Sequence, residues 1–269
     1  MILNLIHLGR VDYAAALDIQ KHLVEARHAN RIGNTLVLLE HPPVLTLGRN
    51  SSRSNILASD EFLAWRGVEV HEINRGGDVT YHGPGQLVGY PILDLRSFTL
   101  SNSSGTPSFA PPLREGWEAG TLPNRRIGAV DYVRLLEESL IRALGDFAVP
   151  AQRISGRTGV WTIPGGAIPE KKIAAIGVHI SRGITSHGFA LNVTTDLRDF
   201  DLIVPCGITD RTVTSLELEA SEGPTPTTME HAINAVARHF ARVFEHQVLW
   251  LDLADLGLDI KLPLDRTRP

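Results

Sequence analysis

The chain has 269 residues, 43% of them hydrophobic, and a formal net charge of −4. This length and composition are typical of a globular protein with a sizeable core, and they exclude disorder of the whole chain. The net negative charge argues against a nucleic-acid-binding protein, because contacts with phosphates require an excess of Lys and Arg on one face. We therefore expect no nucleic-acid partner.

The start of the chain and its cysteine content bear on location. Residues 1–8 are largely apolar but are followed by Gly9-Arg10-Val11-Asp12, so they show neither a charged n-region with a long apolar h-region nor a membrane span of about 18 apolar residues. The single cysteine, Cys206, cannot form an internal disulfide, which fits a reducing compartment. The sequence predicts a cytoplasmic protein without a membrane partner.

The first third of the chain alternates between strand and helix patterns. Residues 2–8 predict a strand, and residues 12–30 predict an amphipathic helix with Tyr13, Leu17 and Val24 near one face. Short apolar runs then predict further strands of a mixed sheet. These runs are residues 35–39, 44–47, 68–73 and 87–93.

A glycine-rich stretch, residues 75–86, contains four glycines and a proline and leads directly into the apolar run 87–93. Composition alone favours an ordinary tight turn. A binding loop is the alternative, because glycines let backbone N–H groups approach a ligand closely. In that case Arg75, Thr80, Tyr81 and His82 would supply hydrogen-bond donors and a titratable group beside the exposed backbone.

Residues 97–128 show neither helix nor strand periodicity and are rich in Pro, Ser, Gly and Thr. We interpret them as a surface loop insertion. A mobile loop is the simpler role. A lid or partner-binding element is the alternative, since long loops are often functional.

Regular patterns resume after the insertion. Residues 130–144 predict a helix, residues 173–180 and 184–193 predict strands, and residues 230–244 predict a helix with Thr227 and Glu230 spaced as a capping box. Neither an internal repeat nor an interdomain linker is visible. The sequence therefore predicts one domain over residues 1–269, of the α+β class.

Cys206 and Lys172 are candidates for a catalytic pair. Cys206 stands between Pro205 and Gly207, which leave its sulfur uncrowded, although a lone cysteine is more often a small buried hydrophobe. A nucleophilic thiol needs a nearby cation or base to stabilise its thiolate. Lys172, at the start of a strand-like run, is the candidate, whereas a solvated lysine is the alternative and Lys171 beside it is equally placed.

Five segments occur in an order that closely resembles the lipoyl(octanoyl) transferase family: residues 39–49, 75–86, 172–178, 186–193 and 202–208. The resemblance extends from about residue 3 to about residue 244, interrupted at the insertion. It implies the catalytic-domain fold of biotin and lipoate protein ligases, a mixed sheet flanked by helices. It also implies an acyltransferase that moves an octanoyl or lipoyl group from acyl carrier protein to a lysine of a lipoate-dependent enzyme domain, with no cofactor.

The same resemblance implies the partners and the site. The donor would be octanoyl-acyl carrier protein, and the acceptors would be lipoyl domains of 2-oxoacid dehydrogenases and the glycine cleavage H protein. The family's lysine directly precedes Ile-Ala-x-x-Gly, which selects Lys172 over Lys171 as the partner of Cys206, the nucleophile that forms a thioester intermediate. Substrate contacts are expected from Arg75, Gly76, Gly77, Asp78, Val79, Thr80, Tyr81, His82, Ala175, Ile176, Gly177, Gly188, Phe189 and Ala190.

Several alternatives stay open on sequence grounds. His82 and His187 are as easily structural histidines as substrate-binding ones. A metal site is disfavoured because the histidines show no HExxH spacing and one cysteine cannot build a zinc cluster. An ATP-dependent lipoate protein ligase and a noncatalytic acyl-binding relative are the competing functions, and both are disfavoured by the presence of Cys206 together with Lys172.

Overall fold

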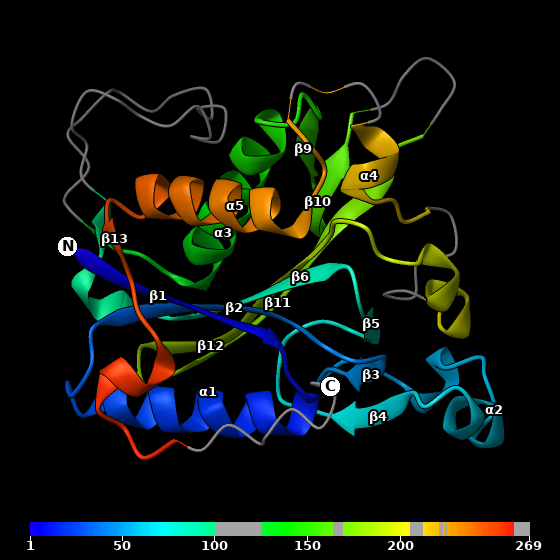
Figure 1. The fold of residues 1–269 in the computed structure, drawn as a ribbon, viewed down its shortest axis with the longest axis horizontal. Helices are drawn as coiled ribbons and strands as arrows, with labels where there is room; N and C mark the ends of the chain where they lie inside the picture. Colours follow the sequence, from blue (N-terminus) through cyan, green and yellow to red (C-terminus); the bar gives the residue numbers. More distant parts are fainter. Residues whose placement is uncertain (101–124, 164–168, 205–211, 221–222, 224, 261–269) are drawn as a thin grey trace, which may run out of the picture.

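The computed structural model describes residues 1–100, 125–163, 169–204, 212–220, 223 and 225–260. A large twisted sheet of eight strands forms the centre of the molecule, with helices on both faces (Figure 1). Its strands, in spatial order, are β13 (Gln247–Trp250), β1 (Ile2–Arg10), β2 (Asn34–Glu40), β6 (Gln86–Ile92), β12 (Ile184–Asn192), β11 (Lys172–Ser181), β10 (Arg157–Thr162) and β9 (Ala151–Ile154).

The sheet is mixed in direction. β1 runs parallel to both β13 and β2, whereas every pair from β2 through β6, β12, β11 and β10 to β9 is antiparallel. The predicted mixed sheet flanked by helices is thus confirmed. The predicted strands over 35–39, 44–47, 87–93, 173–180 and 184–193 are present with ends shifted by no more than about two residues, as is usual for such boundaries.

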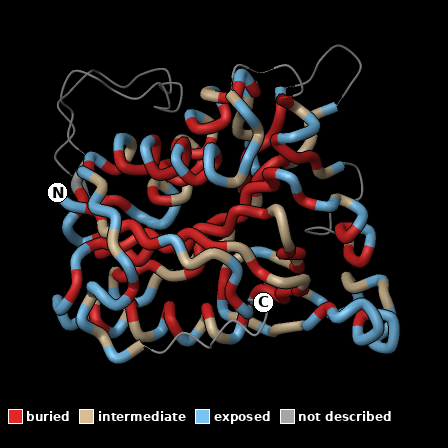
Figure 2. Tube along the Cα trace, viewed as in Figure 1, coloured by how far each residue is buried: buried red, intermediate tan, exposed pale blue. Residues whose placement is uncertain are grey.

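The two faces of the sheet carry separate hydrophobic cores. In β2, Leu36 and Leu38 face one core, and Val37 and Leu39 face the other, because successive side chains of a strand point to opposite faces. The first core lies under α3 (Ala129–Gly145) and α5 (Met229–Val243), and the second lies under α1 (Tyr13–His28). Figure 2 shows the buried residues concentrated in the sheet and on the inner sides of these helices.

The buried face of α1 differs slightly from the predicted one. Tyr13 is buried as expected, but Leu17 and Val24 are only half-buried. Ala16, Gln20 and Leu23 form the inner stripe instead. The stripe contains the small Ala16 and the polar Gln20, so hydrophobicity alone does not identify it.

A smaller sheet beside the main one positions the glycine-rich stretch. Its strands, in spatial order, are β4 (Glu69–Glu72), β3 (Val44–Leu47) and β5 (Thr80–His82). It has its own hydrophobic cluster, which includes Leu45, Val79, Tyr81 and Phe200. The helix α2 (Asp60–Trp65) precedes β4, and the short helix α4 (Leu216–Glu219) lies between β12 and α5 in the chain.

The described ends of the predicted insertion belong to the fold. β7 (Thr99–Leu100) pairs in antiparallel fashion with β8 (Arg125–Arg126), and the flanking Phe98 and Ile127 are each only 7% exposed in the first core. The rest of the insertion, residues 101–124, lies outside the described residues. The boundaries at 97 and 128 are therefore too wide for a segment without core contacts.

The cap of α5 is one residue later than predicted. Thr228, not Thr227, is the N-cap, and its side chain accepts a hydrogen bond from the backbone N–H of His231.

Among the helices that the structure describes, none combines the length and the apolar character needed to cross a bilayer.

Candidate functional site

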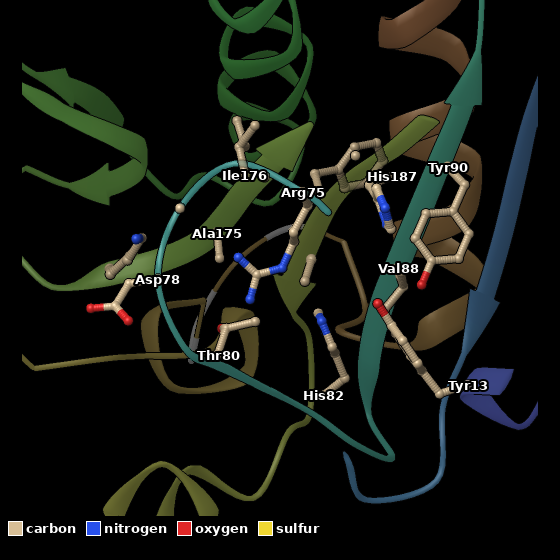
Figure 3. A pocket seen from close by; sticks show the side chains of 16 residues that line it. Tyr13, Arg75, Asp78, Thr80, His82, Val88, Tyr90, Ala175, Ile176 and His187 are labelled. Atoms are coloured by element: carbon tan, nitrogen blue, oxygen red, sulfur yellow. The ribbon is translucent and has the colours of Figure 1, made fainter. Parts of the chain in front are cut away.

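The glycine-rich stretch and the central strands line a pocket that is partly open to solvent. Figure 3 shows the side chain of Arg75 in its middle, between Ala175 on one side and His82 and His187 on the other. The lining residues come from α1, the segment 75–82, β6, β11 and β12. They are Tyr13, Arg75, Gly77, Asp78, Thr80, His82, Val88, Tyr90, Lys172, Ala175, Ile176, Gly177, His187, Gly188, Phe189 and Ala190.

Most of the predicted substrate-contacting residues line this pocket, but three do not. Because side chains alternate along β5, Thr80 and His82 face the pocket, whereas Tyr81 packs in the core of the smaller sheet. Val79, directly before the strand, packs there too, and Tyr81 donates a hydrogen bond to Asp199 at 2.6 Å. Gly76 contributes its backbone, whose N–H donates to Val178 O of β11 at 3.0 Å.

The close approach of the glycine-rich stretch to β11 depends on Gly177. A Cβ atom at this position would lie 2.8 Å from Gly76 O and 2.9 Å from Arg75 Cδ. Both distances are shorter than carbon contacts normally allow, so a larger residue would push the stretch away from the strand. The glycine in this strand therefore marks a close backbone approach at the site.

Arg75 is only 7% exposed, and hydrogen bonds fix the position of its guanidinium group. Its Nη2 donates to Thr46 O at 2.9 Å and to Thr46 Oγ1 at 2.8 Å, and its Nη1 donates to Gly76 O at 3.0 Å. These acceptors leave its positive charge inside the pocket. That charge disfavours protonation of the nearby imidazoles.

The imidazoles around the pocket are neutral at physiological pH. Burial lowers the pKa of His82 to about 3, with further lowering by His41 and Arg75. Burial, followed by the charges of Arg75 and His179, lowers the pKa of His187 to about 4. His187 also has a left-handed backbone, with φ of 54°, and lies 2.9 Å from Asn74 through Nε2. Such strain is frequently stored at functional sites.

One end of the pocket is formed by residues that sequence reasoning missed. These are Tyr13 and Tyr90, whose hydroxyl pKa values are raised by burial, and Val88. Tyr90 OH lies 2.7 Å from His41 Nε2. The two-residue period in β6 could have placed Val88 and Tyr90 on one face. No local signal brings Tyr13 of α1 to them.

Lys172 lies at the junction of this pocket and a second one. The second pocket shares Thr80, Lys172, Ala175 and Ala190 with the first. Lys172 Nζ is 5.4 Å from the centroid of the Trp161 ring, a cation–π distance. Lys171 instead forms an ion pair of 3.0 Å with Glu219.

Cys206 lies outside the described residues, but the chain on both sides of it borders the site. Val204 donates its N–H to Asn55 O at 2.8 Å, and Asn55 Nδ2 donates to both carboxylate oxygens of Asp78 at 3.0 and 2.8 Å. On the other side, Lys172 N donates to Thr212 O at 2.9 Å. In the described part of the chain, no group of three or more His, Cys, Asp or Glu side chains is arranged to hold a metal ion.

Comparison with known proteins gives a consistent result. Residues 12–109 and 121–241 match the family described as lipoyl protein ligase A/B catalytic domain. An octanoyltransferase of Acidobacterium capsulatum is 69% identical over 94% of this chain and 94% of its own length. An octanoyltransferase of Koribacter versatilis is 50% identical over 93% of this chain and 88% of its own length.

A solved structure shares the fold. It is a bipartite lipoate protein ligase from Thermoplasma acidophilum, described with its E2 lipoyl domain. The TM-score is 0.64 at 14% identity, over 95% of this chain and 89% of that one. The structural agreement concerns the fold, whereas the family match and the sequence relatives show that the chain belongs to the lipoyl protein ligase A/B catalytic domain family and, within it, to the octanoyltransferases, which are acyltransferases of protein lipoylation.

Proposed function

We propose that this chain transfers an octanoyl group from acyl carrier protein to a lysine of a lipoyl domain through a thioester on Cys206. The observation that carries the proposal is Lys172 at the junction of two cavities, one of them lined by small and apolar residues of β11 and β12. The segments that flank Cys206 border the same cavities. A donor thioester and an acceptor amine could therefore reach one reaction centre.

The first half-reaction exchanges one thioester for another. The Cys206 thiolate attacks the acyl carbonyl, a C–S bond to Cys206 forms, and the bond to the pantetheine sulfur breaks. Lys172 takes the thiol proton from Cys206 and returns it to the departing sulfur. Because one thioester replaces another, this step is nearly balanced in free energy and requires no nucleotide.

The second half-reaction forms an amide. The neutral amine of the acceptor lysine attacks the S-acyl group, a C–N bond forms, and Cys206 departs and regains a proton. An amide is more stable than a thioester, so this step is favourable overall. In both half-reactions the tetrahedral intermediate requires hydrogen-bond donors for its oxygen.

The pocket suits a linear hydrocarbon chain. Ala175, Ile176 and Ala190 provide apolar walls, and Gly177 and Gly188 line the pocket without a side chain of their own. Each buried methylene contributes about 0.8 kcal/mol, so a pocket of fixed depth favours one chain length. The acceptor is proposed to be a lipoyl domain, by analogy with the Thermoplasma ligase and its E2 lipoyl domain, together with the related glycine cleavage H protein.

The proposal is tested by incubating the protein with octanoyl-acyl carrier protein in the absence of ATP and measuring the mass of the intact chain. We expect an octanoyl adduct that neutral hydroxylamine removes, as it does a thioester. Cys206→Ser should abolish the adduct and Lys172→Ala should strongly reduce its rate. The double variant should be scarcely worse than Cys206→Ser, because the pair acts as one unit.

Lys171→Ala is the matched control, since Lys171 is paired with Glu219 and should not be required for transfer. An adduct that forms only with ATP and free octanoate would favour the ATP-dependent ligase. Transfer at the wild-type rate by Cys206→Ser would disprove the covalent mechanism.

A further inference from the structure

A chain of buried hydrogen bonds runs from His82, which lines the first pocket, to Gln86 and Asn192, which line the second. His82 Nδ1 lies 2.7 Å from Gln86 Oε1, and Gln86 Nε2 lies 2.9 Å from Asn192 Oδ1. Asn192 Nδ2 in turn lies 2.9 Å from Thr214 O. Each of the four residues is at most 7% exposed. Because these hydrogen bonds are buried, the loss of any one of them would leave an unpaired polar group away from water, which is costly in free energy.

The direction of every bond in this chain follows from its last member. Thr214 O is a backbone carbonyl and can only accept, so the amide nitrogen of Asn192 must face it and Oδ1 must face Gln86. Gln86 Nε2 donates to this oxygen and, at 3.2 Å, to Tyr81 O, so its Oε1 faces His82. An amide oxygen only accepts, and the proton of the imidazole must therefore reside on Nδ1.

The other ring nitrogen of His82 is then fixed as an acceptor. His82 lines the pocket, and within the described part of the chain its Nε2 has no hydrogen-bond partner. Burial and the neighbouring charges lower the pKa of His82 to about 3, so the ring remains neutral near pH 7. A neutral imidazole with its proton on Nδ1 can accept a hydrogen bond at Nε2 but cannot donate one.

The same chain ties His82 to the backbone of Lys172. Thr214 N donates to Lys172 O at 2.9 Å, and Lys172 N donates to Thr212 O at 2.9 Å. Thr214 Oγ1 donates to Glu219 Oε1 at 2.6 Å, which fixes the anchor from the other side. These hydrogen bonds thereby fix the position of His82 relative to the backbone of Lys172, although the two residues belong to different sheets.

We propose that Gln86 and Asn192 are positioning residues that hold His82 with an unprotonated Nε2 toward the pocket, where it accepts a hydrogen bond from the amine of the incoming lysine. The inference rests on the proposed thioester mechanism. In its second half-reaction the attacking amine carries N–H groups, and one of them must be aligned so that the nitrogen lone pair points at the acyl carbon. The oxygen of the tetrahedral intermediate requires hydrogen-bond donors, so an accepting Nε2 of His82 does not stabilise it.

The first test is the tautomer itself, read from the ¹⁵N resonances of the histidine rings. The His82 signals are assigned by their loss in His82→Asn. In the wild type we expect a protonated Nδ1 and an unprotonated Nε2 near pH 7. In Gln86→Met we expect the two tautomers to be mixed. A wild-type ring protonated on Nε2, or on both nitrogens, would overturn the proposal whether or not acyl transfer occurs.

The second test separates the half-reactions in single-turnover experiments. Gln86→Met should slow transfer from the S-octanoyl enzyme to a lipoyl domain by about tenfold, while acylation by octanoyl-acyl carrier protein changes by less than about twofold. Asn192→Ala should have a smaller effect, because Tyr81 O still orients the Gln86 amide. Gln152→Met is the matched control: this half-buried glutamine also donates to a backbone carbonyl, that of Thr162, but it does not line either pocket.

The outcomes of the second test are distinct. Equal slowing of both half-reactions, or unchanged transfer in Gln86→Met, would overturn the positioning role. If Gln86→Met fails to fold, the wild-type tautomer and the Asn192→Ala kinetics decide. Absence of any S-octanoyl wild-type enzyme would instead overturn the proposed function.

Discussion

At the scale of single residues, burial determines the charge states around the pocket. His41 is fully buried, with Nδ1 2.7 Å from Val11 O and Nε2 2.7 Å from Tyr90 OH. Burial lowers its pKa to about 4, against the opposing effect of the bond to Val11. The same cause acts on His82 and His187. These three histidines are therefore neutral near pH 7.

This arrangement predicts a loss of stability in mild acid. The folded-state pKa of His41 lies below the unfolded value of about 6.5, so the unfolded state binds more protons between these values. The contribution of neutral His41 to the free energy of unfolding is complete above pH 6.5 and falls as the pH drops toward 4. For His41 alone, we expect unfolding at pH 5 to be easier than at pH 7.5 by about 2 kcal/mol.

Urea unfolding of His41→Gln at the two pH values measures this contribution. The variant should show a smaller difference between pH 5 and pH 7.5 than the wild type. His22→Gln, at a partly exposed position of α1, should retain the wild-type difference. An identical pH dependence in His41→Gln and the wild type would show that His41 does not titrate as inferred.

Gly159 provides a second residue-scale prediction. It has φ of +124°, and a Cβ there would lie 2.7 Å from Ala174 O and 2.8 Å from Lys172 Cε. Gly159→Ala should therefore cost about 1–3 kcal/mol of stability through backbone strain. By displacing the Lys172 side chain, it should also slow octanoyl transfer by about tenfold or more.

The control for Gly159 is Gly156→Ala. Gly156 also has a positive φ, of +77°, but a Cβ there would have no heavy atom within 4 Å. The Gly156→Ala variant should be less stable than the wild type in urea unfolding but should retain its transfer rate in single-turnover kinetics. Equal transfer rates in the two variants would show that Lys172 needs no clearance from Gly159.

At the scale of elements, the N-terminus of α5 distinguishes structure from sequence pattern. Thr228→Ala removes the side chain that accepts from His231 N and should destabilise the protein by about 1 kcal/mol. Thr227→Ala, at the position that the sequence pattern selected, should change the free energy of unfolding by only a few tenths of that amount. Equal effects in chemical denaturation would mean that the helix begins elsewhere.

The strands that sequence patterns missed are short or irregular. β5, β9 and β13 have three or four residues each, which leaves little length for a two-residue period; the equally short β3 and β4 were recognisable only because they lie in apolar runs. β10 contains Gly159 and an irregular register, which interrupt its pattern. Long amphipathic elements such as α3 and α5 were predictable because their apolar stripes must face a core over several turns.

At the scale of the whole molecule, the predicted insertion can be shortened at a defined place. Leu100 and Arg125 are paired across the β7–β8 ladder, so an Asn-Gly dipeptide could join them as a two-residue hairpin. Replacing residues 101–124 in this way should leave cooperative unfolding intact. Because loop closure becomes easier, stability should stay constant or rise by up to about 2 kcal/mol.

Thermal and urea unfolding of the shortened chain, followed by a transfer assay, measure both roles of the segment. Phe98→Ala is the contrasting variant, since its buried side chain contacts the core and its loss should cost about 3 kcal/mol. Loss of cooperative unfolding on shortening would contradict the prediction. Cooperative unfolding without transfer would identify residues 101–124 as a functional element.

The sequence by itself determined the fold class, the family and most of the pocket lining. Ordered motifs and glycines at close backbone approaches are local properties, and hydrophobic periods record which face is buried in elements such as α3 and α5. Only the tertiary structure showed that Tyr13, Val88 and Tyr90 complete the pocket and that Val79 and Tyr81 pack elsewhere. It alone showed the hydrogen-bond chain from His82 through Gln86 to Asn192. The bond between Gln86 and Asn192 joins residues 106 positions apart, and its geometry depends on sheet register, which no short segment of sequence encodes.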